Sequence, residues 1–281
     1  MIFRKDIMNF RKNKNALKQI QSNSFGAASD VGIVRNENQD AVFIGTNVYN
    51  NLVVIVCDGL GGYKGGAIAS TIVCGLFRDE FLATDFNGKS RKFIEDWFGQ
   101  IVLKSRHHIN NYILNNSYHQ TDLSQMATTI VFSLIANKKI YTFWIGDSRA
   151  YLVDINKQAW QITLDHNLYN ALKKVNATEA TFKKHSNELL ALTNIISKEI
   201  NPDQTFDVSI HDLNTHEKYL ILCSDGFYNF VNSEHFYKLI EENNNDMVLA
   251  SKNLINIAMK NLSNDNVTVA IVNLTEVLHA K

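Results

Sequence analysis

The stretch LVVIVCDGLGG, residues 52–62, decides how the rest of the chain is interpreted. Its unbroken apolar run, mostly β-branched, predicts a buried strand at residues 52–57. Asp58 follows directly, and glycines at positions 59, 61, 62, 65 and 66 come next. A glycine run of this kind lets the backbone approach an ion or a phosphate closely. An Asp-Gly pair after a strand is by itself most often a turn. Asp58 therefore indicates a functional site only if other aspartates of the chain stand next to apolar strands in the same way.

Three other aspartates repeat it. Asp225 follows the apolar run at residues 220–224, Asp265 precedes the run at 267–269, and Asp40 precedes the run at 41–44. Sheet packing can bring the ends of such strands together. Clustered carboxylates repel one another and resist ionisation, and hard cations such as Mg²⁺ and Mn²⁺ remove that penalty. The pattern therefore indicates a divalent-metal site. The Gly-Lys-Ser/Thr ending of a P-loop is absent, which disfavours nucleotide binding of that type.

The order of elements indicates the fold class. Segments rich in Val, Ile, Phe and Tyr, bounded by Asn, Asp and Gly, predict strands. These are residues 41–45, 52–57, 129–136, 140–145, 150–153, 161–163, 205–210, 219–223 and 267–272. Helical periodicity predicts one helix pair within residues 68–113 and a second within 236–258. Because helices do not alternate one by one with strands, we predict an α+β fold with two antiparallel sheets covered by helix pairs.

The remaining segments indicate the domain organisation, and the composition argues against some classes of partner. Residues 1–22 are predicted to be a basic extension, residues 23–275 the folded domain, and the polar stretch at about 165–203 an inserted flap. Lys+Arg and Asp+Glu both number 28, which argues against nucleic acid or an anionic membrane as a partner. No apolar run is long enough to cross a membrane. The three cysteines, Cys57, Cys74 and Cys223, do not suggest a disulfide framework or a zinc site, which fits a reducing cytoplasm. Cys57 and Cys223 stand inside apolar runs and are predicted to be buried.

Several motifs together resemble the bacterial form of the protein phosphatase 2C family, the metal-dependent serine/threonine phosphatases. The motifs are DVGIVRNENQD at residues 30–40, CDGLGG at 57–62, ATT at 127–129, GDSRAY at 146–151, TLDH at 163–166, CSDG at 223–226 and DNVT at 265–268. Each is short, but their order and spacing agree over about residues 25 to 274. The resemblance implies an αββα four-layer sandwich with an inserted flap.

The resemblance also implies roles for individual residues. Asp58 would bridge two Mn²⁺ or Mg²⁺ ions, and the backbone carbonyl of Gly59 would contact the second ion. Asp225 and Asp265 would complete the first ion's site. Two further residues follow in the same way: Asp147 would support a third, weaker metal site with Asp225, and Asp40 would bind metal-bound water. Arg35 would hold the substrate phosphate with its forked guanidinium. A water bridging the two ions would attack phosphorus directly.

The chain departs from the family pattern at a few positions. Leu60 stands where some eukaryotic relatives have a histidine acid, so metal-bound water would protonate the leaving oxygen. Ala127 and the pair Ile196-Ser197 stand where glycines are common. We expect a monomer that acts on phosphorylated proteins, including a serine/threonine kinase or its substrates. Two alternatives stay open: a non-catalytic binding module with the same fold, and a phosphatase dedicated to one regulatory protein.

Overall fold

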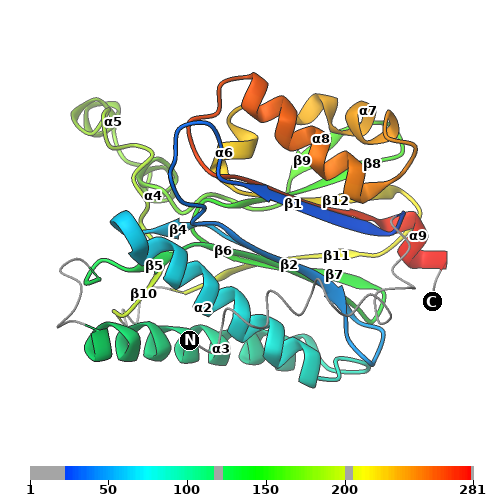
Figure 1. Cartoon of the computed structure of the whole chain (residues 1–281), viewed down its shortest axis with the longest axis horizontal. Coiled ribbons are helices and arrows are strands. Elements are labelled where there is room, and N and C mark those ends of the chain that lie inside the picture. Colours follow the sequence, from blue (N-terminus) through cyan, green and yellow to red (C-terminus); the bar gives the residue numbers. More distant parts are fainter. Residues whose placement is uncertain (1–22, 117–122, 200–204, 280–281) are drawn as a thin grey trace.

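The structure, a computed structural model, describes residues 23–116, 123–199 and 205–279. The predicted basic extension at residues 1–22 lies outside this range. Within it the chain forms four layers, with helices above and below two stacked β-sheets (Figure 1). The predicted α+β sandwich is therefore confirmed. No helix of the described residues is long and apolar enough to cross a membrane.

Two five-stranded sheets form the inner layers, and every pairing within them is antiparallel. The upper sheet has the order β1 (Phe25–Asp30), β13 (Val267–Asn273), β12 (Glu217–Cys223), β8 (Arg149–Asp154) and β9 (Ala159–Gln161). The lower sheet has the order β11 (Asp207–Asp212), β7 (Lys139–Ile145), β6 (Ile130–Ala136), β3 (Leu52–Cys57) and β2 (Ala41–Thr46). A small third sheet joins β10 (Ile196–Ser197), β5 (Ala127–Thr128) and β4 (Gly59–Leu60).

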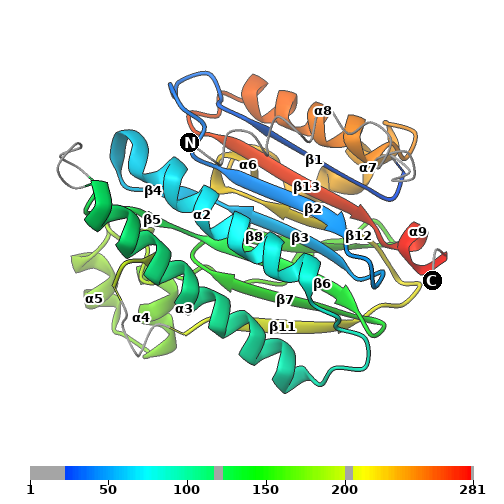
Figure 2. The ribbon, with the colours of Figure 1, turned by 60° about the horizontal axis from the view of Figure 1, so that its bottom comes forward.

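Helices cover the outer face of each large sheet (Figure 2). The long helices α2 (Gly62–Ala83) and α3 (Arg91–Asn116) lie under the lower sheet. The upper sheet is covered by α6 (Asp225–Tyr228), the 3₁₀ turn η1 (Ser233–His235), α7 (Phe236–Glu241) and α8 (Met247–Lys260). The short helix α9 (Leu274–His279) follows β13, and the flap carries α4 (Leu168–Lys174) and α5 (Glu179–Lys184).

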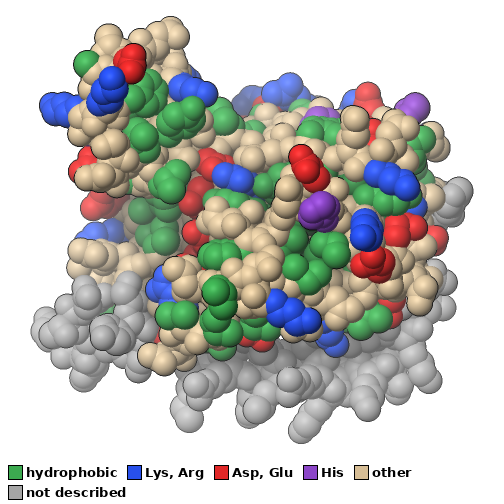
Figure 3. All heavy atoms as spheres, turned by 90° about the horizontal axis from the view of Figure 1, so that it is seen from above, with side chains coloured by type: hydrophobic (Ala, Val, Ile, Leu, Met, Phe, Trp, Pro, Cys, Tyr) green, Lys and Arg blue, Asp and Glu red, His purple; other side chains and the backbone are tan. Residues whose placement is uncertain are grey.

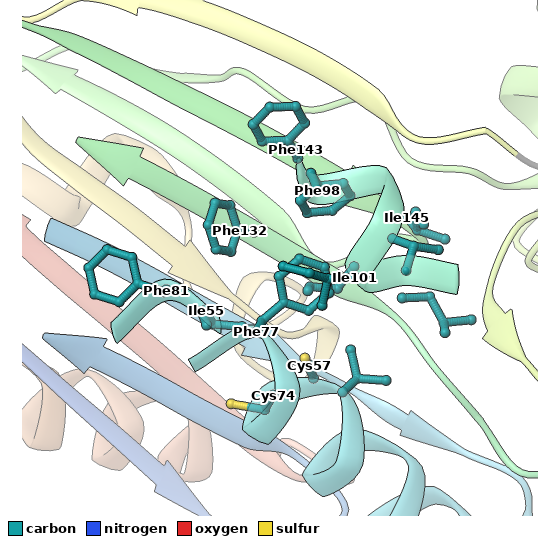
Figure 4. Close-up of a cluster of buried hydrophobic side chains, with 14 of the residues drawn as sticks. Ile55, Cys57, Cys74, Phe77, Phe81, Phe98, Ile101, Phe132, Phe143 and Ile145 are labelled. Carbon is teal, nitrogen blue, oxygen red and sulfur yellow. The ribbon is translucent and has the colours of Figure 1, made fainter. Parts of the chain in front are cut away.

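Strand β3 shows why an unbroken apolar run was needed at residues 52–57. Val54 and Val56 point between the sheets, while Val53, Ile55 and Cys57 point into the cluster between the lower sheet and helices α2 and α3. Both faces of this central strand are thus buried, and a polar residue on either face would be left without water. Phe98 and Phe143 stack in the lower cluster with ring centroids 4.6 Å apart (Figure 4). Cys57 and Cys223 are buried, as predicted, and Cys74 is buried as well; all three are free.

The sequence missed several elements. Strand β1 was not predicted because its sequence FGAASD lacks β-branched and large apolar residues beyond Phe25. Its small residues allow α8 to lie close: a Cβ on Gly26 would stand 2.4 Å from the backbone of Met247. The short elements β4, β5, β10, α5, α6 and α9 were also missed. The strands predicted at 161–163 and 205–210 exist, but they lie at 159–161 and 207–212, so the predicted bounds of each were wrong by two residues.

Candidate active site

A pocket of about 430 Å³ opens at one end of the sandwich, where strands of both large sheets finish. Six of the seven predicted site residues line it: Arg35, Asp58, Gly59, Asp147, Asp225 and Asp265. In the view from above, the flap forms a separate lobe, and acidic side chains gather where that lobe meets the body (Figure 3). The structure thus brings together residues that are up to 230 positions apart in sequence.

Asp58 lies at the end of β3, and its backbone is held from three sides. Its N–H donates to Thr129 Oγ1 at 3.0 Å, and its carbonyl accepts from Thr129 N and Thr128 Oγ1, both at 2.8 Å. Thr129 Oγ1 also bonds to Ser148 Oγ at 2.7 Å. The paired threonines therefore fix Asp58 to the turn that carries Asp147.

Gly59 stands where no other residue fits. A Cβ at this position would lie 2.3 Å from the carbonyl oxygen of Gly66 and 2.5 Å from that of Gln39. Ser70 Oγ on α2 donates to the same Gln39 carbonyl at 2.6 Å. The glycines after Asp58 are therefore used for the close packing of three backbone segments at the pocket floor.

Asp40 lies beneath the pocket rather than on its lining. Its Oδ2 accepts from Ser224 Oγ at 2.8 Å and from Thr268 Oγ1 at 2.6 Å. The pKa of Asp40 is raised to about 7, mainly by burial; the two hydroxyl bonds lower it, and the nearby charges of Asp225 and Asp265 raise it. A carboxyl in this setting can exchange a proton near neutral pH.

Asp225 and Asp265 come from the upper sheet. Asp225 begins α6 directly after β12, and Asp265 stands two residues before β13. Burial raises the pKa of Asp225, and the charge of Asp265 adds to the effect. Asp265 Oδ2 accepts from Arg35 Nη2 at 2.7 Å, and the Arg35 side chain remains about half exposed, at 53%. Arg35 is therefore anchored to one carboxylate while about half of its side chain stays exposed in the pocket lining.

Asp147 occupies the turn between β7 and β8. Burial raises its pKa to about 7, and the charges of Asp225 and Asp165 contribute. The preceding Gly146 has φ of +109°, and a Cβ there would meet the Thr129 side chain at 2.5 Å. This turn therefore needs glycine both for its backbone conformation and for its contact with the residue that holds Asp58.

Asn266 has a structural role that the sequence did not reveal. Its Nδ2 donates to the carbonyls of Val31 and Glu37, at 2.9 and 3.0 Å, and its Oδ1 accepts from Gln39 N at 2.9 Å. One amide thus ties the loop that carries Arg35 to the residue after Asp265. The only available signal was its position inside the motif DNVT. Ser224 and Thr268, the two donors to Asp40, were also missed, because only their positions inside the motifs CSDG and DNVT pointed to them.

The carboxylates suit a divalent ion electrostatically. The pKa of Asp58 lies well above its usual value, first because of burial and then because of Asp40, Asp225, Asp147 and Asp265. Such a cluster is unfavourable without a compensating cation, and its all-oxygen donors match Mg²⁺ and Mn²⁺. Within residues 23–116, 123–199 and 205–279, however, no three acidic, histidine or cysteine side chains already converge in metal-binding geometry. An ion would have to draw the carboxylates together.

Asp165, at the entrance of the flap, has structural contacts. Arg149 donates from Nε and Nη2 to the two carboxylate oxygens of Asp165, at 2.9 and 2.7 Å. The guanidinium carbon of Arg149 also lies 3.6 Å from the ring centroid of Tyr228. Asp165 is therefore fully engaged as an anchor of the strand exit. His166 bonds to Asp207 at 3.2 Å on the opposite side of the flap base.

Comparison with known proteins gives consistent results. A family model described as protein phosphatase 2C matches residues 34–255. A Mycoplasma genitalium protein with a provisional protein-phosphatase name is 43% identical over 250 residues, which are 89% of this chain and 95% of that protein. The serine/threonine phosphatase stp of Listeria monocytogenes is 30% identical over 249 residues, 87% of this chain and 93% of its own.

Solved structures agree with the sequence matches. The serine/threonine phosphatase Stp1 from Staphylococcus aureus has a TM-score of 0.73 at 27% identity, covering 89% of this chain and 94% of its own. The S. agalactiae serine/threonine phosphatase has a TM-score of 0.76 at 26% identity, covering 89% and 98%. The likeness therefore spans both sheets and their helices, not the pocket alone.

Proposed function

Because this chain belongs to the protein phosphatase 2C family of serine/threonine phosphatases, we propose that it hydrolyses phosphoserine and phosphothreonine with Mn²⁺ or Mg²⁺ held in the pocket. The observation that carries the proposal is the meeting of Asp58, Asp225 and Asp265 at one opening, with Arg35 beside them. These groups come from different parts of the chain. If each aspartate only stabilised its own turn, the four side chains would not need to lie in the same pocket.

The donor set suggests which residues hold the ions. Asp58, whose pKa is raised by burial and by the carboxylates around it, would bridge two ions. Asp225 and Asp265 would complete one site, the Gly59 carbonyl would serve the second, and Asp147 would support a weaker third. The phosphatase PstP, which shares this fold at 22% identity, has been solved with two manganese ions. Bound ions of this kind would lower the pKa of a water molecule and so supply the nucleophile for hydrolysis of the phosphoester.

The protein's own groups then have separate tasks. Arg35 would bind the phosphoryl oxygens with its two parallel N–H donors, and its contact with Asp265 holds the guanidinium over the opening. Asp40, with a pKa of about 7, would accept or return a proton beneath the ions. Leu60 lines the pocket and is not an acid, so a protonated leaving group must obtain its proton from solvent-derived water.

The shape of the pocket supports a protein substrate. It is open, and its lining includes an apolar edge, formed by Val34, Leu60 and Leu192, besides the carboxylates. A phosphorylated side chain on an extended segment could reach the floor while its neighbours rest on that edge. We propose phosphoproteins, including a serine/threonine kinase or its substrates, as partners of a chain that acts as a monomer.

Hydrolysis of p-nitrophenyl phosphate and of a phosphothreonine peptide, measured across Mn²⁺ and Mg²⁺ concentrations, tests the proposal. We expect activity only with added metal. Asp58→Asn should lower kcat by at least about 100-fold, the order seen when one electrostatic group of a transition state is removed. Asp79→Asn, which changes an exposed carboxyl on α2, is the matched control and should be unaffected. A folded wild-type protein that stays inert with both metals would support a non-catalytic binding module instead.

A further inference from the structure

Arg106 on α3 is almost completely buried, with 2% of its surface exposed. Burial lowers its pKa, and among the described residues it forms no ion pair with a carboxylate. Instead its guanidinium donates to two backbone carbonyls, from Nη2 to Ile195 at 3.2 Å and from Nη1 to Glu199. A buried arginine is expensive, and an aliphatic side chain would fill the same space more favourably. Its two hydrogen bonds therefore point to a specific task.

The two carbonyls stand on either side of β10. Ile195 directly precedes this two-residue strand, and Glu199 follows it by two positions. β10 pairs with β5, matching Ile196 with Thr128, and β5 pairs with β4, matching Thr128 with Gly59. A two-residue strand has few hydrogen bonds of its own, so its position depends on what holds its ends. Arg106 is the side chain that fastens both ends to α3.

β10 is connected to the pocket in two ways, along the chain and through the small sheet. Along the chain, Leu192 on the pocket edge lies three residues before Ile195, and it bridges to Asn167 at the start of α4. Across the small sheet, β5 carries Thr128, whose hydroxyl donates to the Asp58 carbonyl at 2.8 Å. Arg106 contacts neither Leu192 nor Asp58, yet both are connected to the strand that it holds.

We propose that Arg106 is a positioning residue of the phosphatase, which sets the flap's return strand β10 and through it the Leu192 edge and the Gly59 side of the pocket. The inference rests on the proposed function. It assigns α3, an outer helix with no residue in the pocket, a part in aligning the substrate. The planar fork matters because a lysine ammonium could not reach both carbonyls in one plane.

Steady-state kinetics of Arg106→Met and Arg106→Lys test the proposal, at a temperature where circular dichroism shows each variant folded. For Arg106→Met we expect KM for a phosphothreonine peptide to rise about tenfold, since misplacement of a binding group by about 1 Å costs up to about 100-fold. Hydrolysis of p-nitrophenyl phosphate, which does not need the Leu192 edge, should change by less than about threefold. Arg106→Lys, which keeps the charge but can hold only one carbonyl, should give an intermediate KM and remains the test if the Met variant does not fold.

Ile94→Ala supplies the matched control, because Ile94 is a fully buried residue of the same helix three turns from Arg106. It should lower the thermal midpoint while leaving both KM values unchanged. Hydrogen exchange measured by mass spectrometry should show faster exchange at residues 191–199 and 125–129 in Arg106→Met only. Equal KM values in wild type and Arg106→Met, or the same KM rise in Ile94→Ala, would overturn the proposal. An inactive wild type would instead contradict the proposed function, and the exchange pattern would still report on the strand.

Discussion

At the scale of single residues, the pocket places charges of opposite sign in contact. Arg35 is the only cation among the pocket-lining residues of the described chain, and its Nη2 donates to Asp265 Oδ2 at 2.7 Å. This pairing keeps the guanidinium near the carboxylates although more than half of the side chain is exposed. Exposed ion pairs contribute little to stability, so the contact is better understood as orientation of Arg35 than as support for the fold.

Replacing Arg35 should therefore change substrate binding more than stability. In Arg35→Ala we expect KM for the phosphopeptide to rise about 10- to 100-fold, because charge-assisted hydrogen bonds contribute about 1.5–3 kcal/mol. The unfolding midpoint should remain within about 1 °C of wild type. Arg35→Lys keeps the charge without the fork and should recover only part of the affinity. An unchanged KM in Arg35→Ala would mean that the phosphate binds elsewhere.

Most site residues could be predicted singly, because each metal-type aspartate stands next to a strongly apolar run. The residues that hold them could not. Ser224, Thr268 and Asn266 act through hydrogen bonds to partners more than 180 positions away, and such pairings are set by the register of β12 and β13, which no local pattern encodes. Arg106 likewise has the sequence character of an ordinary helix-surface arginine.

At the scale of elements, the turn between β7 and β8 is the most constrained connection in the site. Gly146 has a φ of +109° and lies against Thr129, which bonds to the Asp58 backbone. We expect Gly146→Ala to lose at least about 2 kcal/mol of stability, because strain and overpacking add. Its kcat should fall as well, because the new methyl group would displace Thr129.

Gly88 offers the control for this prediction. It also has a positive φ, +71°, but a Cβ there would meet nothing within 4 Å. Gly88→Ala should therefore cost only about 1 kcal/mol of left-handed strain and leave kcat unchanged. Urea unfolding and kcat measured on both variants decide the matter. If Gly146→Ala behaved like Gly88→Ala, the turn would not be coupled to Asp58 as described.

The elements that sequence patterns predicted well were those with a full apolar face. β3 and β6 are buried along their whole length and β7 from its second residue on, so their composition alone identified them. β1 is made of small residues that fit beneath α8, and β4, β5 and β10 have two residues each. These strands exist because of tertiary contacts rather than local preference, which is why no pattern revealed them.

At the scale of the whole molecule, the carboxylate cluster should make stability depend on pH and metal together. In chelator, the free energy of unfolding should fall as the pH rises from about 4 to about 7. Burial raises the pKa of Asp40 and of Asp147 from 3.8 to about 7. Between those values the unfolded chain releases protons that the folded chain keeps, so a higher pH favours unfolding. Asp147→Asn should show a shallower dependence.

Added Mn²⁺ should oppose this loss. At about 100 times its dissociation constant, an ion that binds only the folded protein adds about 2.7 kcal/mol. The gain should be larger near pH 7.5 than near pH 5, because the ligands must lose their protons. Urea unfolding with EDTA or Mn²⁺ at both pH values measures it. An identical midpoint with and without Mn²⁺ at the higher pH would argue against a metal held by these carboxylates.

The path of the chain between the two large sheets has a practical consequence. The chain crosses from one sheet to the other four times: between β1 and β2, between β7 and β8, through the flap from β9 to β11, and between β11 and β12. The first three crossings bring Arg35, Asp147 and Leu192 to the pocket. The fourth crossing, residues 213–216, lies at the opposite end of the sandwich. There the end of β11 pairs with the start of β7, and the start of β12 pairs with the end of β8. Leu213 is buried between the sheets, so within this distant bend the exposed Thr215 is the position where a fluorescent reporter or affinity handle should disturb the pocket least.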